Sequence, residues 1–242
     1  MKNKMYKDKK IISIIPARGG SKRLPRKNIL PLAGKPLISY SIEQSLKSEY
    51  IDRTIVSTED KEISEISKKY DAEVIERPKE LATDEATTLV VLQHVLSVLK
   101  EDDYNPDVVV LLQPTSPLRE TSQIDESIRK LINNNANMVV SVSELHIGYK
   151  WLLGIKNGKL HFISKNDLKN TRTQDQKKAY MLNGAINTYK TKIVLKSGIY
   201  NFNDNCLPLI MDKITSMEID DKTDLEIVDL YMKLKNQGYS KK

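Results

Sequence analysis

The chain has 242 residues, with 39 Lys and Arg against 32 Asp and Glu, and its formal net charge of +7 invites a nucleic-acid-binding interpretation. Its apolar residues come in compact runs, which excludes a disordered chain, and no run approaches the ~20 residues of a membrane-spanning helix. The single cysteine, Cys206, excludes an intramolecular disulfide and a cysteine-cluster zinc site and, with no export signal, predicts a cytoplasmic protein.

Short β-branched runs alternate with segments of helical period along residues 11–145. The runs predict buried strands, because helices cover both faces of a parallel sheet. These strands are Ile11–Ile15, Thr54–Ser57, Glu73–Ile75, Val108–Leu112 and Met138–Val142, and the helices are Leu37–Leu46, Leu89–Leu99 and Ile124–Ile132. The alternation predicts an α/β fold with a doubly wound, mostly parallel sheet.

The pattern changes after Glu144. Trp151–Ile155 and Leu160–Ile163, separated by Asn157-Gly158, predict a hairpin with a primed turn. A polar loop follows at Lys165–Lys178, regular structure resumes at Gly184–Tyr189, and Met217–Ile219 leads into a last helix at about Thr223–Leu234. We expect one domain over residues 11–235, a small inserted β/loop region at about 145–185, and flexible lysine-rich ends at 1–10 and 236–242.

The loop after the first strand concentrates basic residues. Ile14–Ile29 reads IIPARGGSKRLPRKNI, with the pair Gly19-Gly20 and five cations at Arg18, Lys22, Arg23, Arg26 and Lys27. Glycines let backbone N–H groups turn toward an anion, and cations supply charge for phosphate oxygens. The loop also lies at the carboxyl end of a strand, where open α/β sheets bind ligands. It therefore predicts a phosphate site, although it matches neither GxGxxG nor GxxxxGK[ST]; the alternative is a solvated basic loop.

This loop resembles the signature of the acylneuraminate cytidylyltransferase family, and four later segments resemble that family's other motifs in order. They are RPKELATDEATT (Arg77–Thr88), LLQPTSPLR (Leu111–Arg119), YMLNGAI (Tyr180–Ile186) and EIDDKTDL (Glu218–Leu225). The resemblance implies a nucleotidyltransferase with a Rossmann-like sheet that transfers CMP from CTP to the anomeric hydroxyl of a nine-carbon keto-sugar acid. It also implies a Mg²⁺ cofactor, with Mn²⁺ as an alternative, and a homodimer in which the insertion reaches toward the partner's active site.

The resemblance also assigns nucleotide-binding residues. It places Arg18, Ser21 and Lys27 on the triphosphate, Lys27 being the essential lysine, and Asn28, Arg77 and Thr88 beside the nucleotide; Lys22 is a further plausible contact. With Asp220, Arg18 and Lys27 form the expected catalytic set. Arg23 and Arg26 either extend this site or are solvated charges. Asp84 has a structural alternative, since it precedes an expected helix start and is a favourable N-cap residue.

The acceptor side is assigned by the same resemblance to Gln113, Lys150, Arg172 and Gln174. The family's substrate arginine immediately precedes the glutamine, where this chain has Thr173, so Arg172 is displaced by one residue. Ser116 and Arg119 are expected to support the loop, or Arg119 to form a local salt bridge. Asn183-Gly184-Ala185 matches the sialic and legionaminic branches of the family better than the pseudaminic branch.

Glu218 and Asp220 are the expected metal ligands. On an extended strand they would share a face, and one or two carboxylates with substrate phosphates suit magnesium. The family usually carries Asp-x-Asp where this chain has Glu-Ile-Asp. The alternative, an acidic helix N-terminus, fits Asp221 and Asp224 better.

The positive charge lies mainly at the ends of the chain. Residues 1–10 hold five Lys and one Asp, a sum of +4, and Lys241 and Lys242 add +2, which leaves +1 for residues 11–240. The body is thus nearly neutral, with no identifiable nucleic-acid-binding motif, and we expect neither a nucleic-acid nor a membrane partner. The remaining alternatives are an octulosonate or pseudaminic acid cytidylyltransferase, an inactive nucleotide-binding regulator on the same fold, and, less favoured, a basic nucleic-acid-binding protein.

Overall fold

The structure is a computed structural model that describes residues 6–145, 151–163, 177–196, 202 and 205–238. Three residues predicted to bind the acceptor, Lys150, Arg172 and Gln174, lie outside the described residues, as does most of the predicted loop Lys165–Lys178.

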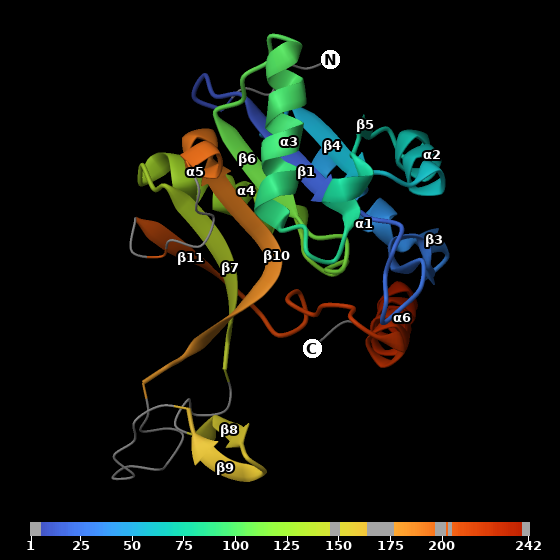
Figure 1. The fold of residues 1–242 in the computed structure, drawn as a ribbon, viewed down its shortest axis with the longest axis vertical. Coiled ribbons are helices and arrows are strands. Elements are labelled where there is room, and N and C mark those ends of the chain that lie inside the picture. Colours follow the sequence, from blue (N-terminus) through green and yellow to red (C-terminus); the bar gives the residue numbers. More distant parts are fainter. Residues whose placement is uncertain (1–5, 146–150, 164–176, 197–201, 203–204, 239–242) are drawn as a thin grey trace.

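The first part of the chain builds a parallel sheet with intervening helices (Figure 1). In chain order the elements are β1 (Ile11–Pro16), β2 (Pro31–Leu32), β3 (Lys35–Pro36), α1 (Leu37–Leu46), β4 (Arg53–Thr58), α2 (Lys61–Lys69), β5 (Glu73–Glu76), α3 (Thr88–Glu101), β6 (Val108–Leu112), α4 (Thr121–Asn133) and β7 (Met138–Glu144). All five predicted strands and all three predicted helices of this region are present.

The last part completes the sheet out of sequence order. Its elements are β10 (Tyr180–Lys190), α5 (Thr191–Lys196), β11 (Cys206–Met211) and α6 (Lys222–Asn236). The seven-stranded order is β11-β7-β10-β6-β1-β4-β5, with β10 antiparallel to both of its neighbours and every other pairing parallel. The predicted fold class, a doubly wound and mostly parallel sheet, is confirmed.

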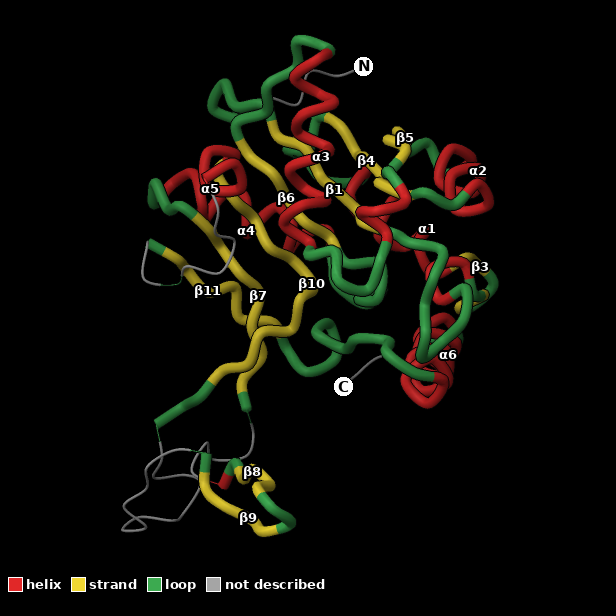
Figure 2. Tube along the Cα trace, viewed as in Figure 1, coloured by secondary structure: helices red, strands yellow, loops and turns green. Residues whose placement is uncertain are grey.

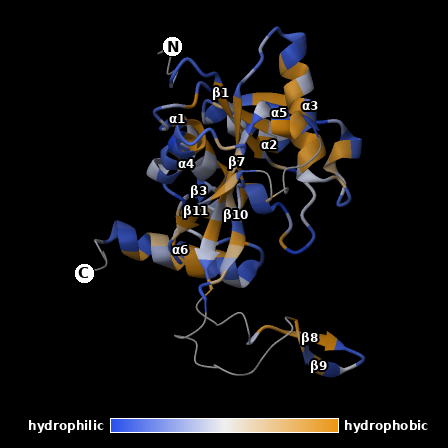
Figure 3. Ribbon diagram, turned by 90° about the vertical axis from the view of Figure 1, so that its left-hand side faces the viewer, coloured by the Kyte–Doolittle hydropathy of each residue, from blue (hydrophilic) through white to orange (hydrophobic). Residues whose placement is uncertain are grey.

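Helices cover both faces of the sheet, which explains why its central strands are buried and mostly apolar. Alternate side chains of β1 point to opposite faces: Ile11 and Ile15 pack with α1, α2 and α4, whereas Ile12 and Ile14 pack with α3 and α5. All four isoleucines have no exposed surface. Figure 3 shows the hydrophobic residues gathered in the sheet and on α3.

Beyond the body, β7 and β10 continue as a two-stranded ribbon (Figure 2). The β10 register shifts between Leu182 and Asn187, and Gly184 within this bulge has φ +69°. Past the ribbon lies the hairpin of β8 (Leu153–Lys156) and β9 (Lys159–Phe162). Asn157 and Gly158 have φ of 52° and 73°, so the predicted primed turn is confirmed.

One local expectation and one structural alternative are wrong. Met217–Asp220 is an irregular segment rather than an extended strand. The N-cap of α3 is Thr87, not Asp84, whose carboxylate pairs with cations of the basic loop instead. Asp221 and Asp224 do form the acidic start of α6, through a capping box. Among the described residues, no helix is long and apolar enough to cross a membrane.

Candidate active site

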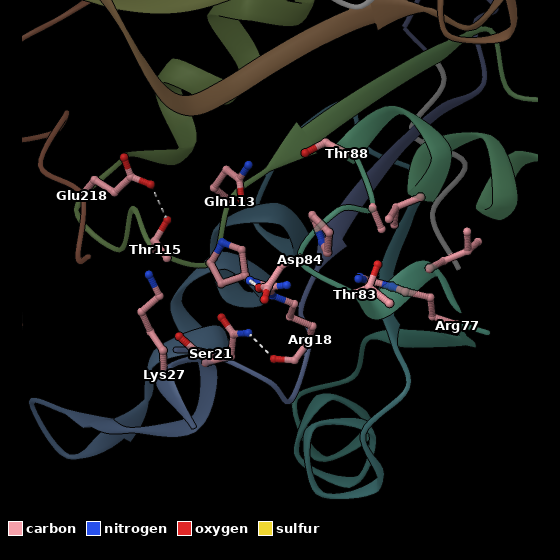
Figure 4. A pocket seen from close by; sticks show the side chains of 16 residues that line it. Arg18, Ser21, Lys27, Arg77, Thr83, Asp84, Thr88, Gln113, Thr115 and Glu218 are labelled. Carbon is pink, nitrogen blue, oxygen red and sulfur yellow. Dashed lines mark hydrogen bonds and ion pairs between the residues drawn. The ribbon is translucent and has the colours of Figure 1, made fainter. Parts of the chain in front are cut away.

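A pocket of about 300 Å³ opens where the strand order of the sheet reverses, between β1 and β6. The chain leaves β1 toward β4 and β5 and returns to β6, so the loops after β1 and β6 diverge and leave a crevice. Eight of the predicted site residues line it: Arg18, Ser21, Lys27, Asn28, Arg77, Thr88, Gln113 and Glu218. In Figure 4, Lys27 and Glu218 lie on one side, and Arg77 and Thr88 on the other.

The basic loop is held from behind by two acids that follow β4. The Gly19 N–H donates to Glu59 Oε1 at 2.7 Å, and a Cβ on Gly19 would lie 2.5 Å from Asp60 Oδ2. Gly19 is therefore required by the close approach of Asp60, and its N–H is used within the protein. The Gly19 N–H thus donates to a carboxylate of the protein rather than toward the pocket. A Cβ on Gly20 would meet nothing within 4 Å.

Arg26 anchors the far end of the loop rather than a phosphate. It adopts a left-handed conformation (φ 58°) and donates to Asp60 at 2.5 and 3.0 Å and to Glu62 at 2.6 Å. These hydrogen bonds raise the pKa of Arg26 and lower that of Asp60. The buried Asn28 side chain donates to Arg18 O at 2.9 Å and closes the loop on itself. The charge of Arg26 is thus used to shape the loop.

Asp84 pairs with two of the loop's cations. Its carboxylate lies 2.8 Å from Arg18 Nη2 and also contacts Lys22 Nζ. Both contacts lower the pKa of Asp84, and the contact with Lys22 has the larger effect. Lys22 itself is not part of the pocket wall, whereas Arg18 and Asp84 are. The carboxylate therefore holds, in this structure, the cations that were predicted to bind phosphate.

Arg77 lies at the opposite side of the pocket, directly after β5. Its guanidinium donates to Ser57 O at 2.6 Å and to Ser57 Oγ at 3.2 Å, and the residue is 5% exposed. Burial lowers its pKa, an effect that nearby Glu59 opposes. The β4 end thus fixes the orientation of Arg77 within the pocket wall.

Lys27 and Asp220 join the basic loop to the segment before α6. Lys27 Nζ donates to Ile219 O at 3.1 Å and to Asp220 Oδ1 at 3.2 Å, while Arg23 reaches the other carboxylate oxygen at 3.4 Å. The Arg23 side chain is 75% exposed and that of Lys27 only 15%. A desolvated cation acts more strongly on nearby charge, so Lys27 is the stronger candidate for the chemistry.

Glu218 stands apart from Asp220 in its contacts. Its Oε1 accepts from Thr115 Oγ1 at 3.0 Å, on the loop after β6. Although the side chain is exposed at the pocket mouth, the surrounding protein partly shields it from water and raises its pKa, which the Thr115 hydrogen bond opposes. Between the two acids, Ile219 is fully buried and donates its N–H to Thr115 O at 2.8 Å. An irregular backbone thus presents the two carboxylates.

The donor set at this edge suits a magnesium ion that also binds phosphate. Glu218 and Asp220 offer hard oxygen ligands next to the pocket, as magnesium prefers, with phosphates and waters completing its shell. No group of three or more metal-binding side chains occurs in the part of the chain that the structure describes. A site built from these two residues would therefore depend on the nucleotide for its remaining ligands.

Three residues that matter to the pocket were missed or misread from the sequence. Thr115 directs Glu218, Glu59 holds the basic loop, and Asp84 pairs with its cations. Thr115 lies two residues after Gln113, just past the end of the same strand, and this position could have indicated from the sequence that it lines the site. The other two contacts join segments 40 or more residues apart and carry no local pattern.

Comparison with known proteins identifies relatives over nearly the whole chain. A family model described as Cytidylyltransferase matches residues 12–237. The pseudaminic acid cytidylyltransferase of Campylobacter jejuni serotype O:2 is 32% identical, covering 95% of this chain and 99% of that protein. The CMP-N,N'-diacetyllegionaminic acid synthase of Legionella pneumophila is also 32% identical, over 95% and 99%. The N-acylneuraminate cytidylyltransferase of Escherichia coli O18:K1:H7 is 36% identical over 94% of this chain but only 53% of that protein.

A similar fold occurs among solved structures. The CMP:2-keto-3-deoxy-manno-octonic acid synthetase complexed with CTP superposes with a TM-score of 0.71 over 93% of this chain and 99% of that one. At 18% sequence identity, this similarity concerns the fold.

Proposed function

The chain belongs to the cytidylyltransferase family, and on that premise we propose that it transfers CMP from CTP to the anomeric hydroxyl of a nonulosonic acid, N-acetylneuraminic or legionaminic acid, with release of pyrophosphate. The observation that carries the proposal is the pocket between β1 and β6, where the predicted phosphate-binding and nucleotide-binding residues meet. Relatives named as CMP-forming enzymes for three nonulosonic acids support the reaction class.

The reaction requires stabilisation of charge on phosphate. The anomeric hydroxyl gives up its proton to water as its oxygen forms a bond to the α-phosphorus. The bond from that phosphorus to the oxygen that bridges to the β-phosphate breaks, and pyrophosphate leaves. Arg18 and Lys27 line the pocket, and we assign them to the triphosphate together with Ser21 and Lys22. Preorganised cations favour the transition state because phosphoryl transfer spreads negative charge over the phosphate oxygens.

We assign the nucleoside to the side of the pocket formed by Arg77 and Thr88. Asn28, which also lines the pocket, is kept as a further contact beside the nucleotide. The hydrogen bonds from Arg77 to Ser57 leave part of the guanidinium for a ligand, because arginine has five N–H donors. Both residues lie across the pocket from Lys27, an arrangement that suits a ligand with an aromatic base at one end and phosphates at the other.

We assign a magnesium ion, or Mn²⁺ in its place, to Glu218 and Asp220. Bound there, the ion would neutralise phosphate charge and hold the phosphates in a reactive geometry. Asp220 would then exchange its contacts with Lys27 and Arg23 for the ion, which frees Lys27 for the nucleotide. The longer side chain of Glu218, compared with the family's aspartate, reaches Thr115 and is held in place by it.

For the acceptor, Gln113 is the candidate that the structure describes, on the loop after β6 beside the β10 bulge. We keep Lys150, Arg172 and Gln174 as proposed acceptor contacts from the insertion. Pseudaminic acid is the second candidate acceptor, because the Campylobacter relative with that name matches along 99% of its own length.

A homodimer is proposed on the apolar surface of the insertion. The side chains of Ile155, Leu160 and Ile163 on the hairpin are 76, 69 and 66% exposed, and Met181 on the ribbon is 54% exposed. Ile155 and Leu160 are paired across the hairpin, and Figure 3 shows β8 coloured as hydrophobic. Exposed apolar residues gathered in this way favour an interaction site. A partner's site would then receive the insertion. The cytoplasmic location stays a prediction.

The test is a pyrophosphate-release assay with CTP and Mg²⁺ over a panel of sialic, legionaminic, pseudaminic and octulosonic acids. We expect release with a sialic or legionaminic acid and little with the eight-carbon acid. A folded protein that binds CTP but gives no release with any acid would support the inactive-regulator alternative instead.

A further inference from the structure

Arg119 is the largest side chain buried completely in the described protein, and the proposed reaction makes no direct use of it. It is 1% exposed and lies on the loop between β6 and α4, six residues after Gln113. Among the described residues no carboxylate forms an ion pair with it, so the predicted local salt bridge is absent. Burial lowers the pKa of Arg119 to about 9. A buried charge without an opposite charge is costly, so the hydrogen bonds it makes are informative.

The guanidinium connects three separate segments. Its Nη1 donates to Ala185 O, in the β10 bulge, at 2.6 Å; its Nε donates to Gln44 Oε1 at 3.0 Å; and its Nη2 contacts Ser41 Oγ. Gln44 and Ser41 both lie on α1. The guanidinium of Arg119 thus links helix α1 to the β10 bulge.

The contacts continue to the residue assigned to the acceptor. Ser41 Oγ donates to Gln113 O at 3.3 Å, and the Gln44 side chain donates to Pro117 O at 2.7 Å. On the opposite side, a Cβ on Gly184 would lie 4.0 Å from Gln113 Cγ. Gln113, at the start of the loop after β6, therefore lies against the β10 bulge, and Arg119 is linked to both, to Gln113 through Ser41 and to the bulge through Ala185.

We propose that Arg119 is a positioning residue for the acceptor: through Ser41 it fixes the backbone of Gln113, and through Ala185 it fixes the bulge that Gln113 lies against. This inference rests on the proposed function. In this proposal Arg119 sets the distance between the loop after β6 and the β10 bulge, the two segments that flank the acceptor. The proposed nucleotide contacts of Arg18, Lys27 and Arg77 do not involve it. Lysine cannot replace it, because one ammonium lacks the planar fork that reaches all three acceptors.

The experiment compares Arg119→Met, Arg119→Lys and Ser41→Ala with Ser39→Ala. Ser39 is the matched control, since it is a buried serine on the same helix whose hydroxyl bonds Pro36 O and has no part in the Arg119 contacts. Two readouts are taken: kcat and KM for each substrate in the pyrophosphate assay, and hydrogen exchange of the amides of Ala185 and Ile186. The free energy of unfolding of each variant is measured alongside.

We expect Ser41→Ala and Arg119→Lys to raise the KM for the acceptor roughly fivefold to tenfold, because each removes buried hydrogen bonds that link Arg119 to the backbone of Gln113. Arg119→Met should do so more strongly if it folds. The KM for CTP should stay within twofold. The amides of Ala185 and Ile186 should exchange hydrogen faster in these variants than in the wild type. In Ser39→Ala their exchange rate should be unchanged. Equal increases in both KM values, or bulge amides that exchange at the wild-type rate, would overturn the proposal. A wild-type protein without turnover would count against the proposed function alone, because hydrogen exchange reports on the bulge without it.

Discussion

Lys27 and Asp220 are 193 residues apart in the sequence, and in the folded protein Lys27 Nζ lies 3.2 Å from Asp220 Oδ1. The contact brings the predicted essential lysine of the basic loop to the predicted metal ligand before α6. The ion pair thus links the basic loop to the segment before α6, with the Lys27 side chain only 15% exposed beside the pocket.

Lys27→Ala should reduce kcat/KM for CTP by about 10²–10³-fold, because a preorganised cation at the phosphates is removed. Arg23→Ala is the matched control: it removes a cation that reaches the same carboxylate but is 75% exposed, so we expect less than a threefold effect. Steady-state kinetics with CD-monitored melting check this. Near-normal turnover in Lys27→Ala would remove the residue from the site.

Gly19→Ala should weaken CTP binding and lower the melting temperature, since its Cβ would lie 2.5 Å from Asp60 Oδ2 and displace the loop or the acid. Gly20→Ala has open space around its Cβ and should behave like the wild type. The pair is compared by calorimetric titration with CTP and by thermal unfolding. Equal behaviour of the two variants would contradict the anchoring of the loop at Gly19.

Asp84→Asn should tighten CTP binding by roughly twofold to fivefold, the range expected from one exposed ion pair. In this structure the carboxylate pairs with Arg18 and Lys22, and on the proposed assignment the triphosphate would have to displace it from both. Glu85→Gln, which removes the same charge one residue away, should change the affinity much less. Weaker binding in Asp84→Asn would mean that the carboxylate organises the cations for the nucleotide rather than competing with it.

Asp60 should make stability depend on pH. Arg26 lowers the pKa of Asp60, so the ionised carboxylate favours the folded state. This stabilisation is present above about pH 4, the usual pKa of aspartate, and is lost as the pH falls through the lower folded pKa. Asp60→Asn should therefore be less stable than the wild type at pH 7, with the difference shrinking below pH ~4.

Asp60→Ala separates the charge from the helix cap. Asp60 Oδ1 accepts from Ile63 N at 2.9 Å, a cap that asparagine can keep and alanine cannot. The alanine variant should lose about 1 kcal/mol more than the asparagine variant, and this increment should remain at low pH. Urea unfolding at several pH values measures both parts. A pH-independent gap between wild type and Asp60→Asn would refute the role of the ion pair.

The sequence was sufficient for the central sheet because burial on both faces leaves runs such as Val108–Leu112 without polar residues. It was not sufficient for β11, where Pro208 argues against a strand; the edge position tolerates it, since only β7 pairs with β11. Helix α2 was missed because only Ile63 and Ile66 give it an apolar face. No sequence pattern indicated that β10 inserts between β6 and β7 and runs antiparallel to both.

The same division applies to the site. Position after a strand was enough to place Arg18 and Gln113 at one pocket, because parallel strands end at a common edge. The pairing of Asp84 with Arg18, and the extent to which Arg119 is buried, depend on the paths of loops between the strands. Those paths are set by tertiary packing, which no local spacing records.

The place of β10 between β6 and β7 has a consequence for the order in which the protein can fold. Strands β1, β4, β5 and β6 pair only with one another up to residue 112, so half of the sheet is available early in synthesis. From then on β6 has an open edge until residues 186–190 arrive, and β7 and β11 can join the sheet only through that late strand. Such distant pairing is slow, and an unpaired edge invites association with other chains. A chain that stalls between residues 112 and 186 would thus present strands β1, β4, β5 and β6 with an unpaired edge at β6, which could pair with another chain.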